Sequence, residues 1–302
     1  MTDRRFRIDR GRLHELIDRE RRRFVQRNAR SRALFERTGR ALLHGVPMNW
    51  MTMWPGAFPI FFREARGNRI ADVDHHTYVD FCLGDSGAMA GHAPEPVAAT
   101  LDRRFRTGST TMLPTEDAAW VGEELTRRFG LEVWQFALSA TDANRWVLRL
   151  ARHLTGRQKI LVFNHSYHGT VDEANLILDP DGQARTRLNN IGPAVDPRET
   201  TEVVEWNDIE ALERVLEPRD VACVLAEPVL TNIGIVFPEA GYHQRLREIA
   251  DRTETLLVID ETHTFCAGPG GCTRAFRLRP DFVTLGKAIA GDNLDHQHPG
   301  IA

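Results

Sequence analysis

The first part of the chain changes from a helical to an alternating pattern of apolar residues. From about Asp9 to His44, apolar residues recur every three or four positions, which predicts a long helix ended by "GVP". Between Phe58 and Asp85, two alternating apolar runs are separated by "RGN" and "DVDHH". This pattern predicts a short antiparallel meander. We therefore expect residues 1–85 to form an N-terminal helical arm with a small antiparallel β segment.

Beyond residue 85, short apolar runs alternate with helical segments. The predicted strands are "WQFALS", "KILVFN", "VACVLAEP", "TLLVIDE" and "DFVTLG". The predicted helices between them are "TDANRWVLRLARHLTG", "DIEALERVLEP" and "AGYHQRLREIADRTE". Alternation of this kind, with continuously apolar strands, predicts an α/β domain whose mostly parallel sheet is covered on both faces. We assign residues 86–291 to this domain and residues 292–302 to a divergent tail.

The composition is that of a globular protein and favours no charged partner. A formal net charge of −3 is too near zero to indicate nucleic acid or a membrane surface. The opening residues lack a signal peptide's apolar segment, and no run approaches the ~20 apolar residues of a membrane helix. Cys82, Cys223, Cys266 and Cys272 do not follow a zinc-binding spacing. We expect a cytoplasmic protein with reduced cysteines and no metal site.

Polar residues stand at the carboxyl ends of several predicted strands. "LLVIDE" ends on Asp260 and Glu261, "VLAEP" carries Glu227, and "FALS" ends on Ser139. Ligands of open α/β sheets bind beyond the carboxyl ends of the strands. These positions therefore predict one shared site.

The segment "SATDAN" places Ser139, Ala140 and Thr141 before a helix that starts at about Asp142. Two hydroxyl groups and unpaired backbone N–H groups at a helix N-terminus can hold a phosphate. The alternative is an ordinary helix cap formed by Ser139 or Thr141. The sequence contains neither the GK[ST] of a Walker loop nor GxGxxG, which argues against a dinucleotide-binding oxidoreductase.

Two further elements follow predicted strands. The loop "NHSYHGT" carries Tyr167 and His168, which could cover the face of a flat ligand or simply pack in the loop. Lys287 follows "DFVTLG" and is one of only two lysines in the chain. A lysine amine attacks aldehydes when its pKa is lowered, although a surface lysine at a helix start is the alternative.

Pyridoxal phosphate requires such groups together. Its aldehyde reacts with a lysine, its ring nitrogen needs a carboxylate, its phosphate needs a cradle, and its ring packs against an aromatic side chain. Lys287, Asp260, "SATDAN" and Tyr167 would supply these groups. The combination predicts a pyridoxal-phosphate enzyme.

From about Gly84 to Gly291 the sequence resembles the class III aminotransferases of pyridoxal-phosphate fold type I, particularly the glutamate-1-semialdehyde aminomutase-like branch. The motifs that carry the resemblance, in chain order, are "GHAPEPV", "LPTEDAAWVGEEL", "SATDANRWVLRLAR", "YHG", "EPVLTNIGIVFP", "LLVIDETHTF" and "PDFVTLGKAIAG". The resemblance implies the large α/β domain of fold type I. It also implies a cofactor, pyridoxal 5'-phosphate, and a homodimer in the intact family.

The resemblance also assigns roles to residues. Lys287 would be the Schiff-base lysine and Asp260 the partner of the pyridine nitrogen. The other cofactor-binding residues would be Ser139, Ala140 and Thr141 at the phosphate, Tyr167 and His168 at the ring, and Glu227, Asn232 and Thr262 near the ring or substrate. Ala140 stands where the family usually has glycine, and Thr262 where a valine normally packs against the ring. Glu261 would support the site from behind.

The implied activity is transfer of an amino group between an amino donor and a carbonyl acceptor. Two alternatives remain: an aminomutase acting on one substrate, and a truncated, inactive remnant of such an enzyme. After Gly291, "DNLDHQHPGIA" departs from the family pattern, so we expect a missing interior strand and a missing C-terminal small domain. The sequence leaves the substrate open, and also whether the chain folds and dimerises.

Overall fold

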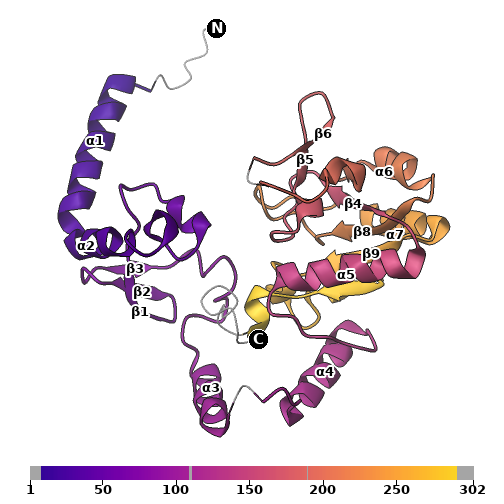
Figure 1. Ribbon diagram of the computed structural model, residues 1–302, viewed down its shortest axis with the longest axis horizontal. Coiled ribbons are helices and arrows are strands. Elements are labelled where there is room, and N and C mark those ends of the chain that lie inside the picture. The colour runs from indigo at the N-terminus through magenta and orange to yellow at the C-terminus, as the bar shows by residue number, and fades with distance from the viewer. Residues whose placement is uncertain (1–7, 109–110, 189, 291–302) are drawn as a thin grey trace. The chain divides into compact units, whose positions relative to one another are not determined.

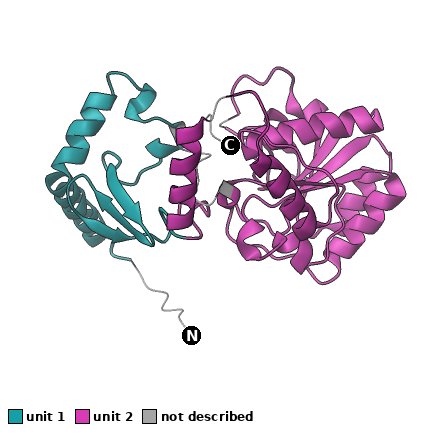
Figure 2. Ribbon diagram, turned by 90° about the horizontal axis from the view of Figure 1, so that it is seen from below, with its two compact units in different colours: residues 1–81, 91–93 teal, residues 82–90, 94–302 magenta. Residues whose placement is uncertain are grey.

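The computed structural model describes residues 8–108, 111–188 and 190–290; the divergent tail predicted at 292–302 lies outside them. The chain divides into two compact units (Figure 2). The first comprises residues 1–81 with 91–93, and the second comprises residues 82–90 with 94–302.

The long helix predicted in the first unit is two helices, α1 (Arg10–Arg27) and α2 (Ala29–Thr38). The break falls at Asn28, whose side-chain amide donates a 2.7 Å hydrogen bond to the Phe24 carbonyl. Asparagine side chains compete in this way with backbone hydrogen bonds, which explains why the helical period does not continue unbroken. Two 3-10 turns follow, η1 (Leu43–Gly45) and η2 (Asn49–Thr52).

The predicted antiparallel meander is confirmed. Its strands are β1 (Phe62–Arg66), β2 (Arg69–Asp72) and β3 (Thr77–Val79). Asp74, in the β2–β3 turn, accepts hydrogen bonds from the backbone N–H groups of Arg30 and Ser31, at 2.7 and 3.0 Å, and from the Ser31 hydroxyl at 2.7 Å. The meander is thereby fastened to the start of α2.

The second unit is built on a five-stranded parallel sheet, in the order β10-β9-β8-β4-β7. Figure 1 labels its three central strands, β4, β8 and β9. Its strands are β4 (Lys159–Phe163), β7 (Thr201–Val204), β8 (Val221–Ala226), β9 (Leu256–Asp260) and β10 (Phe282–Thr284). Residues of β4, β8 and β9 are almost all buried because helices cover both faces of the sheet. The predicted α/β architecture is confirmed.

Two apolar clusters lie on the two faces of this sheet. The covering helices are α5 (Ala140–Thr155), α6 (Ile209–Leu216) and α7 (Tyr242–Thr253). Ile160 and Val162 of β4 belong to one cluster with Leu148 of α5. Leu161, which points to the opposite face, belongs to the other cluster with Leu212 of α6. Alternate residues of one strand therefore bind helices to both faces.

One predicted strand is wrong and others were missed. The segment "WQFALS" forms no strand, and its Phe136 and Leu138 are 58% and 57% exposed, so no strand of the described ranges covers them. The structure adds β7 at the sheet edge and a hairpin of β5 (Leu176–Leu178) and β6 (Ala184–Thr186). β7 lacked an apolar signal because its Glu202 is polar and pairs with Lys159 at 2.8 Å.

The remaining elements are helices and short turns. They are α3 (Glu95–Thr107), α4 (Glu116–Phe129), α8 (Gly271–Ala275), η3 (Asp172–Ala174), η4 (Pro197–Glu199), η5 (Phe265–Ala267) and η6 (Lys287–Ala290). Within the described ranges, no helix is long and apolar enough to cross a membrane. Nor do the described residues contain a group of His, Cys, Asp or Glu side chains suited to a metal ion.

The strand order locates a ligand crevice. From β4 the chain proceeds to β7 on one side, whereas from β8 it proceeds to β9 on the other side. Ligands of open α/β sheets bind beyond the carboxyl ends of two adjacent strands whose connections diverge in this way. Tyr167 and His168 follow β4, and Glu227 follows β8, so the topology gathers predicted site residues at this crevice.

Candidate active site

Asp260, the last residue of β9, is a buried carboxylate with three hydrogen-bond donors. Its Oδ2 accepts from Asn144 Nδ2 and His168 Nδ1, both at 2.9 Å, and its Oδ1 accepts from the Thr262 backbone N–H at 3.0 Å. The residue is only 3% exposed. Burial acts to raise the pKa of Asp260. The hydrogen bond and the charge interaction with His168, together with hydrogen bonds from Thr262 and Asn144, outweigh burial and lower the pKa to about 2. Asp260 is therefore held as a carboxylate.

Asn144 ties this carboxylate to three other elements. From the second turn of α5, its amide also donates to the His168 carbonyl at 3.2 Å and accepts from the Thr284 hydroxyl of β10 at 2.7 Å. This role of Asn144 was not predicted from the sequence. Its only signal is a polar residue on the otherwise buried face of a helix, two positions after Asp142.

The adjacent acid, Glu261, has a different task. It is fully buried and accepts hydrogen bonds from the Thr264 hydroxyl at 2.5 Å and the backbone N–H groups of Cys272 at 3.1 Å and Thr273. The carboxylate thus caps the start of α8, where backbone N–H groups need partners. A Cβ at Gly271 would lie 2.5 Å from Glu261 Oε2, so only glycine fits there.

A second buried carboxylate, Glu227, fixes the loop that carries Tyr167. Its Oε1 accepts from the Tyr167 N–H at 3.0 Å, while its Oε2 accepts from the N–H and the hydroxyl of Thr231, at 3.0 and 2.6 Å. Asn232, next in sequence, donates to the His165 carbonyl at 3.1 Å. Tyr167 itself keeps its side chain 39% exposed. The predicted residues Glu227 and Asn232 thus position the Tyr167 loop.

The residues predicted to hold a phosphate, Ser139, Ala140 and Thr141, lie at the N-terminus of α5. Ser139 Oγ accepts from the Asp142 N–H at 3.1 Å and is the helix cap, as the alternative interpretation held. Thr141 Oγ1 accepts from the Thr170 N–H at 3.2 Å. At Gly169, where φ is +82°, a Cβ would lie 2.0 Å from Thr141 Oγ1. The loop after β4 therefore lies directly against the cradle.

Ala140 and Thr262 lie beside the residue that precedes Lys287. A Cβ on Gly286 would be 2.7 Å from the Ala140 Cβ and 3.2 Å from Thr262 Cγ2. The extra methyl group of Ala140 is accommodated because position 286 is glycine. Thr262 Oγ1 is buried and finds no hydrogen-bond partner among the residues that the structure describes.

Lys287 is buried, at 6% exposure, and its amine contacts a histidine that the sequence did not single out. Its Nζ lies 2.7 Å from His263 Nε2 and 3.4 Å from Asp85 Oδ2. His263 Nδ1 lies 2.5 Å from Thr231 Oγ1. Hydrogen bonding to His263, with the nearby charge of Lys287, holds the pKa of Asp85 well below its ordinary value.

The contacts described above link the predicted site residues into one network. Each predicted residue either makes one of these contacts or is next in sequence to a residue that does. One branch joins Lys287 through His263 and Thr231 to Glu227 and Tyr167. The next residue after Tyr167, His168, opens the branch to Asp260. Chemically, the set offers a buried amine, an ionised carboxylate, an exposed aromatic ring and a helix N-terminus.

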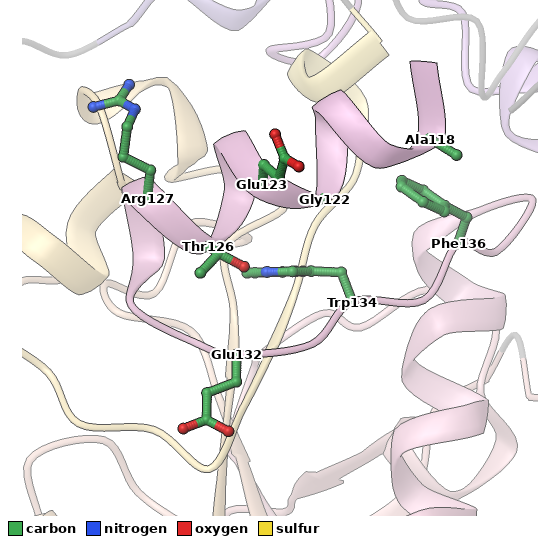
Figure 3. Close-up of a pocket in the computed structure, with 8 residues that line it drawn as sticks. All are labelled: Ala118, Gly122, Glu123, Thr126, Arg127, Glu132, Trp134 and Phe136. Carbon is green, nitrogen blue, oxygen red and sulfur yellow. The ribbon is translucent and has the colours of Figure 1, made fainter. Parts of the chain in front are cut away.

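A hollow beside α4 lies elsewhere in the second unit. Its lining consists of Ala118, Gly122, Glu123, Thr126, Arg127, Glu132, Trp134 and Phe136 (Figure 3). Trp134 and Phe136 form one wall and α4 the other. The lining contains no predicted site residue, so the chemistry described above is not located there.

Comparison with known proteins identifies the family. The family profile described as "Aminotransferase class-III" matches residues 51–297. A glutamate-1-semialdehyde 2,1-aminomutase of Methanothermobacter thermautotrophicus is 35% identical over 266 residues, 87% of this chain and 62% of that protein. The chain therefore spans about three fifths of the length of the curated relatives that it matches.

Two solved structures give the same result in three dimensions. A lysine-to-alanine variant of a Pseudomonas aeruginosa PAO1 glutamate-1-semialdehyde-aminomutase, in complex with PMP, is 47% identical. It superposes with a TM-score of 0.90 over 97% of this chain and 69% of that one. An omega-transaminase of Sphaerobacter thermophilus is 29% identical, with a TM-score of 0.80 over 86% of this chain and 61% of that one.

The chain belongs to the class III aminotransferases, a family of pyridoxal-phosphate-dependent enzymes with fold type I. The resemblance predicted from the motifs between Gly84 and Gly291 is confirmed, and so is the fold class.

The lowered pKa of Asp260 makes a prediction about acid stability. A carboxyl whose pKa falls from 3.8 to about 2 on folding stabilises the fold fully above pH 4 and loses that contribution as the pH falls towards 2. The contribution is about 2 kcal/mol. We expect Asp260→Asn to lose correspondingly less unfolding free energy than the unmodified chain between pH 5 and pH 2, as measured by urea denaturation.

Asp102→Asn is the matched control, because Asp102 is exposed on α3 and pairs with Arg106 at 2.9 Å. Its profile should follow that of the unmodified chain. An unchanged pH dependence in Asp260→Asn would contradict the account of a buried, ionised carboxylate.

Proposed function

We propose that the whole protein transfers amino groups with pyridoxal 5'-phosphate bound at the candidate active site. The observation that carries the proposal is the convergence of a buried amine, Lys287, with an ionised buried carboxylate, Asp260. Both lie at the carboxyl end of one parallel sheet, beside the N-terminus of α5. Membership of the class III aminotransferases supports the same conclusion.

The described residues fit this cofactor. Among the described residues, Asp260 Oδ1 accepts one hydrogen bond, from the Thr262 backbone N–H, so this oxygen can accept another from a ring N–H. Thr262 Oγ1 is buried beside Gly286 without a hydrogen-bond partner in the described part of the chain, as expected where a ligand supplies the missing contact. PMP bound to the related Pseudomonas aeruginosa protein supports the assignment.

We assign roles as follows. Asp260 would face the ring nitrogen, and His168 would hold Asp260 in place. Tyr167 would lie against the ring, with Thr262 on the side of Gly286. The phosphate would be held by Ser139, Ala140 and Thr141, while Glu227 and Asn232 position the Tyr167 loop. Pyridoxal phosphate, when bound, supplies an aldehyde that condenses with amines and a ring that withdraws electrons from the adjoining carbon.

The chain's own contribution is to place charges and protons. The Asp260 carboxylate, ionised at neutral pH, stabilises a proton on a nitrogen placed at Oδ1. Lys287 Nζ is the group that attacks an aldehyde and can afterwards accept or donate a proton at a neighbouring carbon. Its burial excludes water from this proton transfer. The substrates would be a small-molecule amino donor and a carbonyl acceptor.

Binding of the cofactor is the first test. Addition of pyridoxal phosphate to the purified chain should produce a visible absorption band that depends on Lys287. Lys287→Ala should abolish the band. Lys159→Ala is the matched control, because Lys159 is the only other lysine and pairs with Glu202 and Asp220 at 2.8 and 2.9 Å. A band that survives in Lys287→Ala, or disappears in Lys159→Ala, would overturn the assignment.

A second candidate function is an aminomutase that moves an amino group within one substrate. The names of the 35% and 47% identical relatives favour it over transfer between two substrates. The whole protein, incubated with glutamate-1-semialdehyde alone, should then form the isomeric amino acid. Conversion that requires an added amino donor and carbonyl acceptor would instead establish a transaminase.

A second copy of this chain is the partner that we propose, in the cytoplasm. Trp146, Leu150 and Leu154 recur every four residues on α5 and are 52%, 44% and 64% exposed, and Trp120 of α4 is 66% exposed. Large apolar side chains that are exposed together on one helix face are typical of an interface.

Light scattering should therefore give twice the monomer mass for the whole protein, and Trp146→Arg should shift the mass towards the monomer. Leu188→Arg, at a residue that is 94% exposed outside this helix face, is the control and should leave the mass unchanged. A monomer at micromolar concentration would contradict the proposal.

A further inference from the structure

The amine of Lys287 ends a hydrogen-bonded chain that begins at a buried carboxylate. Glu227, 4% exposed, accepts from the Thr231 hydroxyl at 2.6 Å. Thr231 Oγ1 lies 2.5 Å from His263 Nδ1, and His263 Nε2 lies 2.7 Å from Lys287 Nζ. Each separation is within hydrogen-bonding distance. The four side chains come from the loop after β8, the segment after β9, and η6.

The direction of each hydrogen bond follows from the groups available. A carboxylate only accepts, so the single hydroxyl hydrogen of Thr231 is donated to Glu227. Thr231 Oγ1 must then accept from His263, which places a hydrogen on Nδ1. A neutral imidazole with a hydrogen on Nδ1 has its lone pair on Nε2. That lone pair faces Lys287 Nζ.

We propose that His263 is the proton acceptor of Lys287, and that Thr231 and Glu227 hold its imidazole in the orientation and tautomer that this requires. A proton leaves Nζ and binds Nε2, which leaves a neutral, nucleophilic amine and an imidazolium. The positive charge on the imidazolium is stabilised through the Thr231 hydroxyl by the Glu227 carboxylate. The inference deepens the proposed role of Lys287 but concerns the chain before any cofactor binds.

Other charged groups around the pair are compatible with this transfer. Asp85 Oδ2 lies 3.4 Å from both Lys287 Nζ and His263 Nε2, so it stabilises the proton on either nitrogen. Tyr167 interacts with Asp85 by charge, and burial raises the pKa of its phenol, which keeps Tyr167 neutral. The preference of the proton for His263 over Lys287 therefore comes from the hydrogen bonds of His263 to Thr231 and of Thr231 to Glu227.

The chain offers an internally controlled test, because Lys287 and Lys159 are its only lysines. Acetic anhydride labels only unprotonated amines, and mass spectrometry of the two lysine peptides gives each rate between pH 6 and pH 10. Hydrogen bonds from Lys159 to Glu202 and Asp220 raise its pKa, so its labelling should be slow and identical in all variants. The full chain is used, free of cofactor.

His263→Gln keeps a hydrogen-bond acceptor at this position but cannot bind a proton. We expect its Lys287 to label roughly tenfold more slowly at pH 8, because no neighbouring imidazole can take up the proton of the amine. Thr231→Val should change the rate in the same direction, whereas Thr231→Ser, which keeps the hydroxyl, should restore it. In denaturant, Lys287 should label equally in every variant.

Two results would overturn the proposal. One is a Lys287 pH profile in His263→Gln and Thr231→Val that matches the unmodified chain. The other needs no variant: ¹⁵N chemical shifts of His263 that place the hydrogen of the neutral imidazole on Nε2. If His263 does not accept the proton of Lys287, Lys287 can still bind the cofactor. If the labelling results agree with proton transfer to His263 but no cofactor band appears, only the proposed function is overturned.

Discussion

The candidate active site, as far as the structure describes it, depends on the buried carboxylate of Asp260. Three donors from three different segments converge on it: Asn144 of α5, His168 of the loop after β4, and the backbone of Thr262. Asn144 also accepts from Thr284 of β10, so one amide joins two strands, a helix and a loop. An unpaired buried charge is far more costly than a paired one, so loss of any donor would destabilise the whole arrangement.

The two adjacent carboxylates at the end of β9 have different functions. Asp260 faces the crevice and keeps one acceptor position at Oδ1, whereas Glu261 faces away and caps α8. Glu227 repeats the strategy at the end of β8, where it orients Tyr167 on one side and, through Thr231, His263 on the other. Glu227 thus positions groups that are expected to touch a ligand and Glu261 fixes the start of α8, whereas Asp260 is the buried acid left to meet the ligand itself.

The features predicted from the sequence were those that a local pattern determines, such as buried strands. The features missed were those that depend on partners far away in the chain. Continuous apolar runs located β4, β8, β9 and β10, because helices bury these strands on both faces. The run "WQFALS" has the same composition but lacks a neighbouring strand among the described residues, and hence is no strand. Lys287 was recognisable because lysines are scarce. Asn144 and His263 were not, because Asp260 lies 116 residues from Asn144 and Lys287 lies 24 from His263, at no characteristic spacing.

Lys287 is the residue through which, as we propose, this chain holds pyridoxal phosphate. Reduction of the mixture with borohydride fixes the cofactor to whichever lysine has reacted with it, and peptide mapping then identifies that lysine. We predict one cofactor mass on the peptide containing Lys287 and none on the peptide containing Lys159. Label on Lys159 alone, or equal label on both lysines, would contradict the account.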